Sequence, residues 1–298
     1  FTSATDTFNT AVGHAAGTSV TTGTQNTFVG GLSGDDSQTG TGNTALGYQS
    51  LSGVVTGGYN TALGWGAGLA ITSGTLNTAV GTQSLFSNTV GSYNTALGEG
   101  ALYSNVDGSK SVAVGRLALY TQDPASAVDM YNVGVGYDAG GKITTGIQNT
   151  LIGGLAGDAI TTGDNNVALG YEALTANTVG DRSTALGNYA LKSQNPSSNA
   201  DMYNVAIGHN AGGDVTTGTQ NTLIGGLAGD AITTADNNTA VGYLSLSANT
   251  TGATNVAVGV AALDSNTTGS SNVGLGVNAL GTNTTASNNT AVGLLALN

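Results

Sequence analysis

The chain has 298 residues, of which 7% are charged, 49 are Gly and none is Cys. A net charge of −12 argues against a nucleic-acid partner, which would need clustered Lys and Arg, and the lack of Cys excludes disulfides and thiolate metal sites. Gly, Thr, Asn and Val form helices poorly, so the composition favours short β-strands joined by turns. No apolar run approaches the roughly 18 residues of a membrane helix, and we therefore expect no membrane insertion.

A repeat built on words such as NTAVG runs along the whole chain. Its closing glycines extend from Gly13 to Gly293 at intervals of 17 residues, except for two intervals of 21, over residues 115–136 and 187–208. A short fixed period is typical of a solenoid, in which each repeat is one coil stacked on the last. The sequence therefore predicts an all-β parallel β-solenoid of 17 coils. We expect residues 1–298 to form a single continuous solenoid segment of a longer fibre protein.

Positions within a coil are counted from the closing glycine, which is position 0. Position −1 is Val, Leu or Ile in every coil, from Val12 to Val292, and this predicts a place in the core. Alternation puts positions −1 and −3 on one face of a strand and position −2, usually Ala or Gly, on the other. Both faces are rather apolar, and a second apolar stripe suggests lateral association with identical chains.

Two further positions suggest hydrogen bonding and turns. Position −4 is Asn in 15 of the 17 coils, the exceptions being Ser111 and Ser183. Stacking would place these amides one above another and form a hydrogen-bonded ladder. Position +10 is Gly in 12 of the 16 coils long enough to include it, which predicts a second turn with positive φ. The expected ladder residues are Asn9, Asn26, Asn43, Asn60, Asn77, Asn94, Asn132, Asn149, Asn166, Asn204, Asn221, Asn238, Asn255, Asn272 and Asn289.

Positions +4 and +7 exchange volume. Position +4 is always Leu or Gly, and a Gly such as Gly157 usually comes with a branched aliphatic at +7, here Ile160. A Leu such as Leu174 usually comes with Asn, here Asn177. One large side chain per coil would thus fill a shared space. The departures are Gly34 with Ser37 and Leu51 with Val54.

The stretch NTLIGGLAGDAITT occurs twice, at residues 149–162 and 221–234. Its GGLAGD segment resembles a phosphate loop, but such a loop needs a following helix, and here another coil follows without a Lys. We interpret the Gly-Gly pair as a packing variant that makes room for a large residue at position −2. Large residues occur at −2 only in the coils that have Gly at +1, in the pairs Phe28 with Gly31, Leu151 with Gly154 and Leu223 with Gly226.

Several segments of the repeat resemble repeats of known protein families. YNVAIGHNAG (203–212), TNVAVGVAAL (254–263) and SNVGLGVNAL (271–280) resemble the head repeats of YadA-like trimeric autotransporter adhesins. NNTAVGYLSLSANTTGATNVAVG (237–259) is similar to repeats of phage and prophage tail-fibre proteins. The resemblance implies a left-handed β-roll that assembles as a homotrimer and serves as an extracellular adhesive fibre, on a virion tail or a bacterial cell surface.

The two 21-residue coils carry the first candidate receptor contacts. Each inserts four residues in the same phase, and together they hold the only prolines of the chain. Insertions in solenoids form loops on one side, often the binding side. Aromatic residues at the outward position +1 could also stack on sugars, although padding between neighbouring chains is the alternative. The candidate receptor-binding residues are Asp123, Pro124, Asn195, Pro196, Tyr137 and Tyr171.

These patterns favour a structural and adhesive fibre segment that binds a cell-surface glycan or protein receptor through weak, multivalent contacts. An ice-binding solenoid is an alternative, since Thr44, Thr61, Thr78 and Thr95 form a row, although Val replaces Thr in other coils. A purely structural extracellular filament is another. No enzyme, metal site or cofactor is predicted, because no Ser-His-Asp set or paired carboxylates are evident and the two histidines, both expected to face solvent, lie eleven coils apart.

Overall fold

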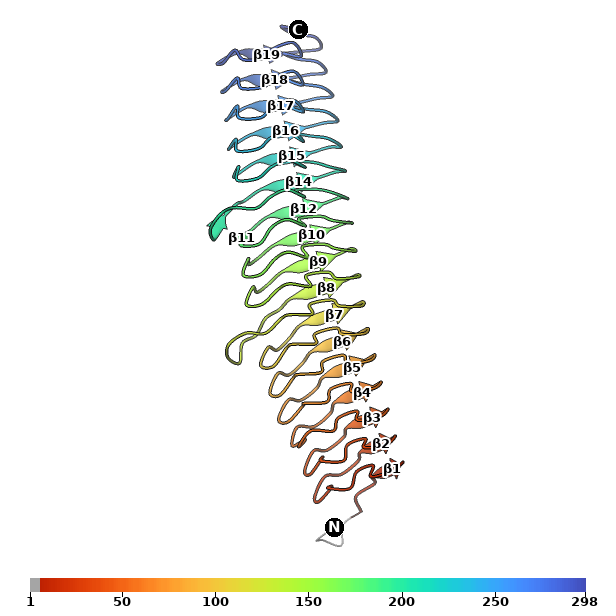
Figure 1. The fold of residues 1–298 in the computed structure, drawn as a ribbon. Coiled ribbons are helices and arrows are strands. Elements are labelled where there is room, and N and C mark those ends of the chain that lie inside the picture. The colour runs from red at the N-terminus through yellow and green to blue at the C-terminus, as the bar shows by residue number, and fades with distance from the viewer. Residues whose placement is uncertain (1–5) are drawn as a thin grey trace. The chain divides into compact units, whose positions relative to one another are not determined.

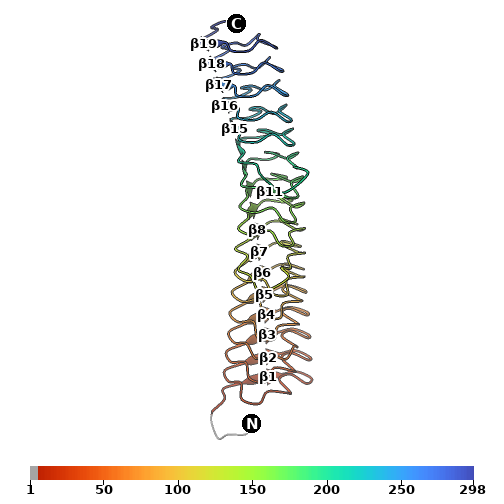
Figure 2. The ribbon, with the colours of Figure 1, turned by 90° about the vertical axis from the view of Figure 1, so that its left-hand side faces the viewer.

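The computed structural model describes residues 6–298, and the chain divides into two compact units, residues 1–148 (unit 1) and 149–298 (unit 2). Each unit is an all-β parallel solenoid, and its described residues contain no helix. Every coil contributes one strand of three residues to a parallel sheet (Figure 1). Figure 2 shows the coils of unit 1 stacked one above another in a view at 90° to the first. The predicted fold class and coil period are therefore confirmed.

The described part of unit 1 contains eight strands, which pair in chain order. Each residue faces its equivalent in the next coil, as Thr44 faces Thr61. The first 21-residue coil keeps this register, because Val112 still faces Val133 across the insertion. The strands are β1 (Thr10–Val12), β2 (Thr27–Val29), β3 (Thr44–Leu46), β4 (Thr61–Leu63), β5 (Thr78–Val80), β6 (Thr95–Leu97), β7 (Val112–Val114) and β8 (Val133–Val135).

Unit 2 repeats this arrangement and adds a second, two-stranded sheet. β11 (Gly180–Asp181) pairs with β13 (Ala200–Asp201), apart from the column of main strands (Figure 1). The main strands are β9 (Thr150–Ile152), β10 (Val167–Leu169), β12 (Thr184–Leu186), β14 (Val205–Ile207), β15 (Thr222–Ile224), β16 (Thr239–Val241), β17 (Val256–Val258), β18 (Val273–Leu275) and β19 (Thr290–Val292).

Burial alternates along every main strand except β1, whose three residues are exposed, and the middle residue, at position −2, points into the core. Ala45, Ala62 and Leu151 occupy this position and are buried, whereas position −1 is exposed or half-buried in every coil. The prediction that position −1 lies in the core is therefore wrong. The amide at position −4 has to be inside the coil to bond to the backbone, and the two-residue alternation then turns position −2 inward and position −1 outward.

The closing glycine is required by its conformation and by the next coil. Gly47 has a φ of +137°, and a Cβ on it would lie 2.5 Å from the carbonyl oxygen of Gly64. At position +10, by contrast, Gly40 and the other glycines do not have positive φ, so the predicted second turn of that kind is absent from the described residues. A Cβ on Gly40 would lie 2.5 Å from the carbonyl oxygen of Gly57, so close stacking explains this glycine.

The volume exchange between positions +4 and +7 is confirmed. A Cβ on Gly157 would lie 2.8 Å from both Ile160 Cδ1 and Leu151 Cδ2. One departure is explained by Phe28, whose ring would lie 2.5 Å from a Cβ on Gly34 and fills the space that an aliphatic would otherwise take. In the other departure, Val55 at position +8 is buried and Val54 is exposed.

Candidate binding surfaces

The outward face of the main sheet carries a continuous row of aliphatic side chains beside a row of Thr and Val within each unit. Positions −3 and −1 form two parallel rows along it, and no residue of either row is buried. The side chains of Leu46 and Leu169 are 45% and 46% exposed. Position −1 is aliphatic in every coil, so each unit exposes a row of branched side chains that its own fold does not cover.

The asparagines at position −4 bond mainly to backbone rather than to one another. Asn43 Nδ2 donates to the carbonyl oxygen of Gly57 at 3.0 Å, and the Asn43 backbone N–H donates to Asn26 Oδ1 at 2.9 Å. Asn43 Oδ1 accepts from the backbone N–H of Asn60 at 2.9 Å and from Asn60 Nδ2 at 3.2 Å. Asn43 thus ties three coils together and lies inside the solenoid, and the buried position of the amides between Asn26 and Asn272 makes this ladder structural and leaves it inaccessible to a receptor.

The two gaps in this ladder, at Ser111 and Ser183, are filled by glutamines. Gln122 Nε2 donates to Ser111 Oγ at 3.1 Å and to Asn105 Oδ1 at 3.0 Å, while Asn132 Nδ2 donates to Gln122 Oε1 at 3.0 Å. Gln194 makes the same bonds to Ser183 and Asn204. Sequence reasoning missed this repair, although both serines stand in the coils that carry an insertion and Gln occupies position +7 only there.

The insertion loops expose some of the candidate receptor residues and bury others. Asp123 and Asn195 are exposed, but Pro124 and Pro196 are buried and lack the accessibility that receptor contact requires. Both exposed residues also bond to the preceding coil. Asp123 Oδ1 accepts from the backbone N–H of Val106 at 3.3 Å, and Asn195 Oδ1 accepts from Thr178 Oγ1 at 2.7 Å. The accessible part of each loop lies beyond its proline, at residues 125–129 and 197–199.

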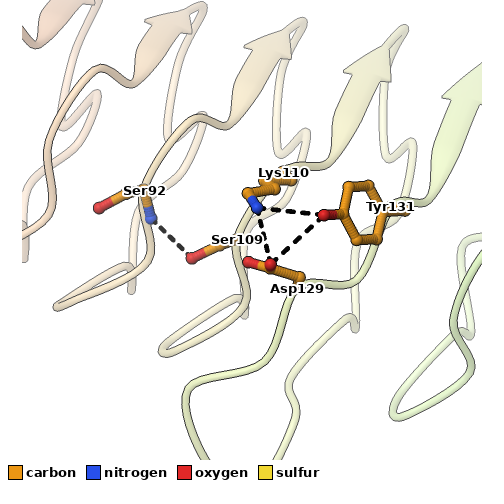
Figure 3. A network of polar contacts seen from close by, with 5 residues as sticks. All are labelled: Ser92, Ser109, Lys110, Asp129 and Tyr131. Carbon is orange, nitrogen blue, oxygen red and sulfur yellow. Dashed lines mark hydrogen bonds and ion pairs between the residues drawn. The ribbon is translucent and has the colours of Figure 1, made fainter.

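Each insertion loop is held at its end by a basic residue, an aspartate and a tyrosine. Lys110 Nζ lies 2.7 Å from Asp129 Oδ2 and 3.1 Å from Tyr131 Oη, and Tyr131 Oη lies 3.4 Å from the same carboxylate (Figure 3). The hydrogen bonds to Asp129 and Tyr131 raise the pKa of Lys110 above its ordinary value. In unit 2, the corresponding residues are Arg182, Asp201 and Tyr203.

Tyr137 and Tyr171 are exposed, and each has aromatic or charged neighbours. The Arg116 guanidinium lies 5.8 Å from the centre of the Tyr137 ring. Tyr171 meets Tyr189 edge to face at 5.6 Å, and its hydrogen bond with Glu172 raises its pKa. Tyr189 in turn meets the exposed His209 at 5.8 Å.

Position −5 of unit 1, just before the ladder position, forms a column of large exposed side chains that sequence reasoning did not single out. Tyr59, Tyr93 and Tyr131 are 63%, 57% and 48% exposed, and Leu76 and Lys110 lie in the coils between them. The signal in the sequence was an aromatic residue just before the ladder position in alternate coils.

Over residues 6–298 the surface has no pocket, and no three His, Asp or Glu side chains converge on a common point where a metal ion could bind. This part of the chain contains no helix with the length and apolar character needed to cross a membrane. No protein-family model and no curated protein sequence matches the chain.

Proposed function

We propose that this chain is a structural and adhesive segment of an extracellular fibre and that it assembles as a homotrimer through the outward face of its sheet. The single observation that supports this proposal is the uncovered row of branched aliphatic side chains at position −1. An exposed apolar stripe of this regularity is typical of surfaces that associate with other chains. The thin core also favours association, because position −2 contributes mainly Ala and buries little apolar area within one chain.

In such an assembly, the corners and insertion loops would remain outside and meet the receptor. Asp123, Asn195, Tyr137 and Tyr171 are the exposed candidates on these parts of the surface. Each weak contact would occur three times in a trimer, which raises the overall affinity without a deep binding site. The segment would then act by extending the fibre and repeating weak contacts, rather than by catalysis, on a virion tail or a bacterial surface.

The assembly is tested by measuring the native mass with light scattering. The proposal expects three times the 29.0 kDa mass of one chain. Replacing Leu46, Leu63 and Leu97 together by Lys should give monomers, because the charges would have to be buried in the interface. Lys at the exposed loop residues Ser126 and Ser198 is the matched control and should leave the mass unchanged. A wild-type chain that runs as a monomer contradicts the proposal.

Ice binding is the second candidate, because Thr44 and Thr61 are exposed side by side on the outward face of the sheet. Regular hydroxyl and methyl groups on such a surface could order water. Thermal hysteresis separates the two functions: clear activity at micromolar protein would favour ice binding over attachment.

A further inference from the structure

We propose that Tyr59, Tyr93 and Tyr131 form a binding strip for a neutral, extended β-linked polysaccharide that runs along the stacking direction of unit 1. This inference rests on the proposed attachment function and names a ligand class for it.

The backbone conformation at the position of the three rings favours residues other than tyrosine. Position −5 has positive φ, at 59° for Tyr59, 60° for Tyr93 and 51° for Tyr131. Bulky side chains are rare in this region, whereas Asn and Gly adopt it readily. In unit 2 the same position is mostly small and polar, and it includes Asn165, Asn237, Thr254, Ser271 and Asn288. The turn therefore does not require tyrosine at this position.

Burial does not account for the rings either, because about half or more of each side chain is exposed. The Tyr59 ring leans on the preceding coil, where a Cβ on Gly42 would lie 2.9 Å from its Cδ1. The Tyr131 ring likewise lies 5.2 Å from Lys110 Nζ of the coil before it. The rings of Tyr59 and Tyr131 are thus fixed in direction, and about half or more of each of the three side chains remains exposed.

The spacing of the rings follows from the hydrogen bonds between coils at this column. The backbone N–H of Tyr59 donates to the carbonyl oxygen of Thr41 at 2.9 Å, and that of Tyr93 donates to Thr75 at 3.0 Å. Coils bonded in this way are about 4.8 Å apart, so rings in alternate coils repeat at about 10 Å. In an extended β-1,4-linked glycan, the same face of the sugar recurs at every second residue, with a closely similar repeat.

The flanking groups favour a neutral sugar chain over other partners. Tyrosine stacks its ring on the apolar face of a sugar while its hydroxyl bonds to polar groups. Lys110 is neutralised by Asp129, and the net charge of −12 disfavours anionic polysaccharides. Ser92 directly precedes Tyr93, and its backbone N–H donates to the hydroxyl of Ser109 in the next coil at 3.0 Å (Figure 3).

The test uses the full chain, with cellohexaose and hydroxyethylcellulose as β-linked probes and maltohexaose as the α-linked control. Calorimetry and affinity electrophoresis should show binding of the β-linked probes only. Tyr59→Asn with Tyr93→Asn should weaken binding by about tenfold or more, since two stacking rings are lost. The variant should unfold at the same or a higher temperature, because Asn suits positive φ better than Tyr.

Tyr203→Asn is the matched control, since Tyr203 occupies the same position in unit 2 but has Asn237 instead of a ring two coils further on. It should bind as the wild type does. Wild-type binding of neither β-linked probe, or unchanged binding by the double variant, overturns the strip. A changed native mass of the double variant also overturns it, because the column would then be a contact between subunits. A monomeric wild type that binds cellohexaose supports the strip and contradicts the proposed trimer, whereas a trimer that binds no β-glucan overturns the strip alone.

Discussion

The ring of Tyr171 lies against the backbone of Gly154, one coil earlier, where a Cβ would sit 3.6 Å from the ring atom Cδ2. The sequence suggests instead that this second glycine of the Gly-Gly pair makes room for Leu151. The structure assigns that role to Gly157, whose Cβ would meet Leu151 at 2.8 Å, so the second glycine serves an exposed tyrosine outside the core. The same relation joins Gly31 to Tyr48 and Gly226 to Tyr243.

The two glycines of a pair should therefore respond differently to substitution. Gly153→Ala should destabilise unit 2 by about 3 kcal/mol, because φ is +135° and a Cβ would lie 2.7 Å from the carbonyl carbon of Gly170. Gly154→Ala should cost less than about 1 kcal/mol, since its Cβ would make an ordinary contact. Urea denaturation of both variants measures the difference. Equal losses would contradict the assignment of separate roles.

The glutamine in each insertion coil should stabilise the fold by completing the ladder. Gln122→Ala removes the bonds to Ser111, Asn105 and Asn132 inside the coil and should cost about 2–4 kcal/mol. Adding Ser111→Asn to this variant should restore part of the loss, because Asn is the residue that other coils have at this position. Chemical denaturation checks both changes, and a double variant no more stable than Gln122→Ala would contradict the repair.

The exchange between positions −2, +4 and +7 predicts that one coil type can be converted into the other. Gly157→Leu alone should cost about 3 kcal/mol, because the new side chain overlaps Leu151 and Ile160. Adding Leu151→Ala and Ile160→Asn reproduces the pattern of the next coil, which has Ala168, Leu174 and Asn177. The triple variant should recover at least about half of the lost stability in thermal unfolding. A triple variant less stable than Gly157→Leu would show that the positions are independent.

The period, the strand positions and the ladder could be predicted from the sequence because every coil repeats them. The face of the strand that points into the core could not be predicted, since a row of Val, Leu and Ile at position −1 is apolar enough to suggest a core. The deciding residue is Asn43, whose buried bonds fix the inward face and leave only Ala45 to share it. Gln122 and the tyrosine column were missed because they depend on contacts between particular coils, which the average repeat hides.

Asp181 is the buried carboxylate whose ionisation should oppose folding. It is 8% exposed, and burial raises its pKa above the ordinary value of 3.8, although a hydrogen bond from the backbone N–H of Asp164 at 2.7 Å acts in the opposite direction. With a raised pKa, the folded chain binds more protons than the unfolded chain between the two pKa values. Stability due to this group therefore falls as the pH rises through that window.

Asp181→Asn should consequently raise the melting temperature at pH 7, because it removes the buried charge and keeps an oxygen to accept from Asp164. The gain should shrink as the pH falls below the folded-state pKa of Asp181, where the carboxyl of the wild type is protonated and carries no charge either. Thermal unfolding of both proteins from pH 3 to pH 8 measures this. A gain for Asp181→Asn that is the same at every pH would mean that packing, rather than charge, sets its effect.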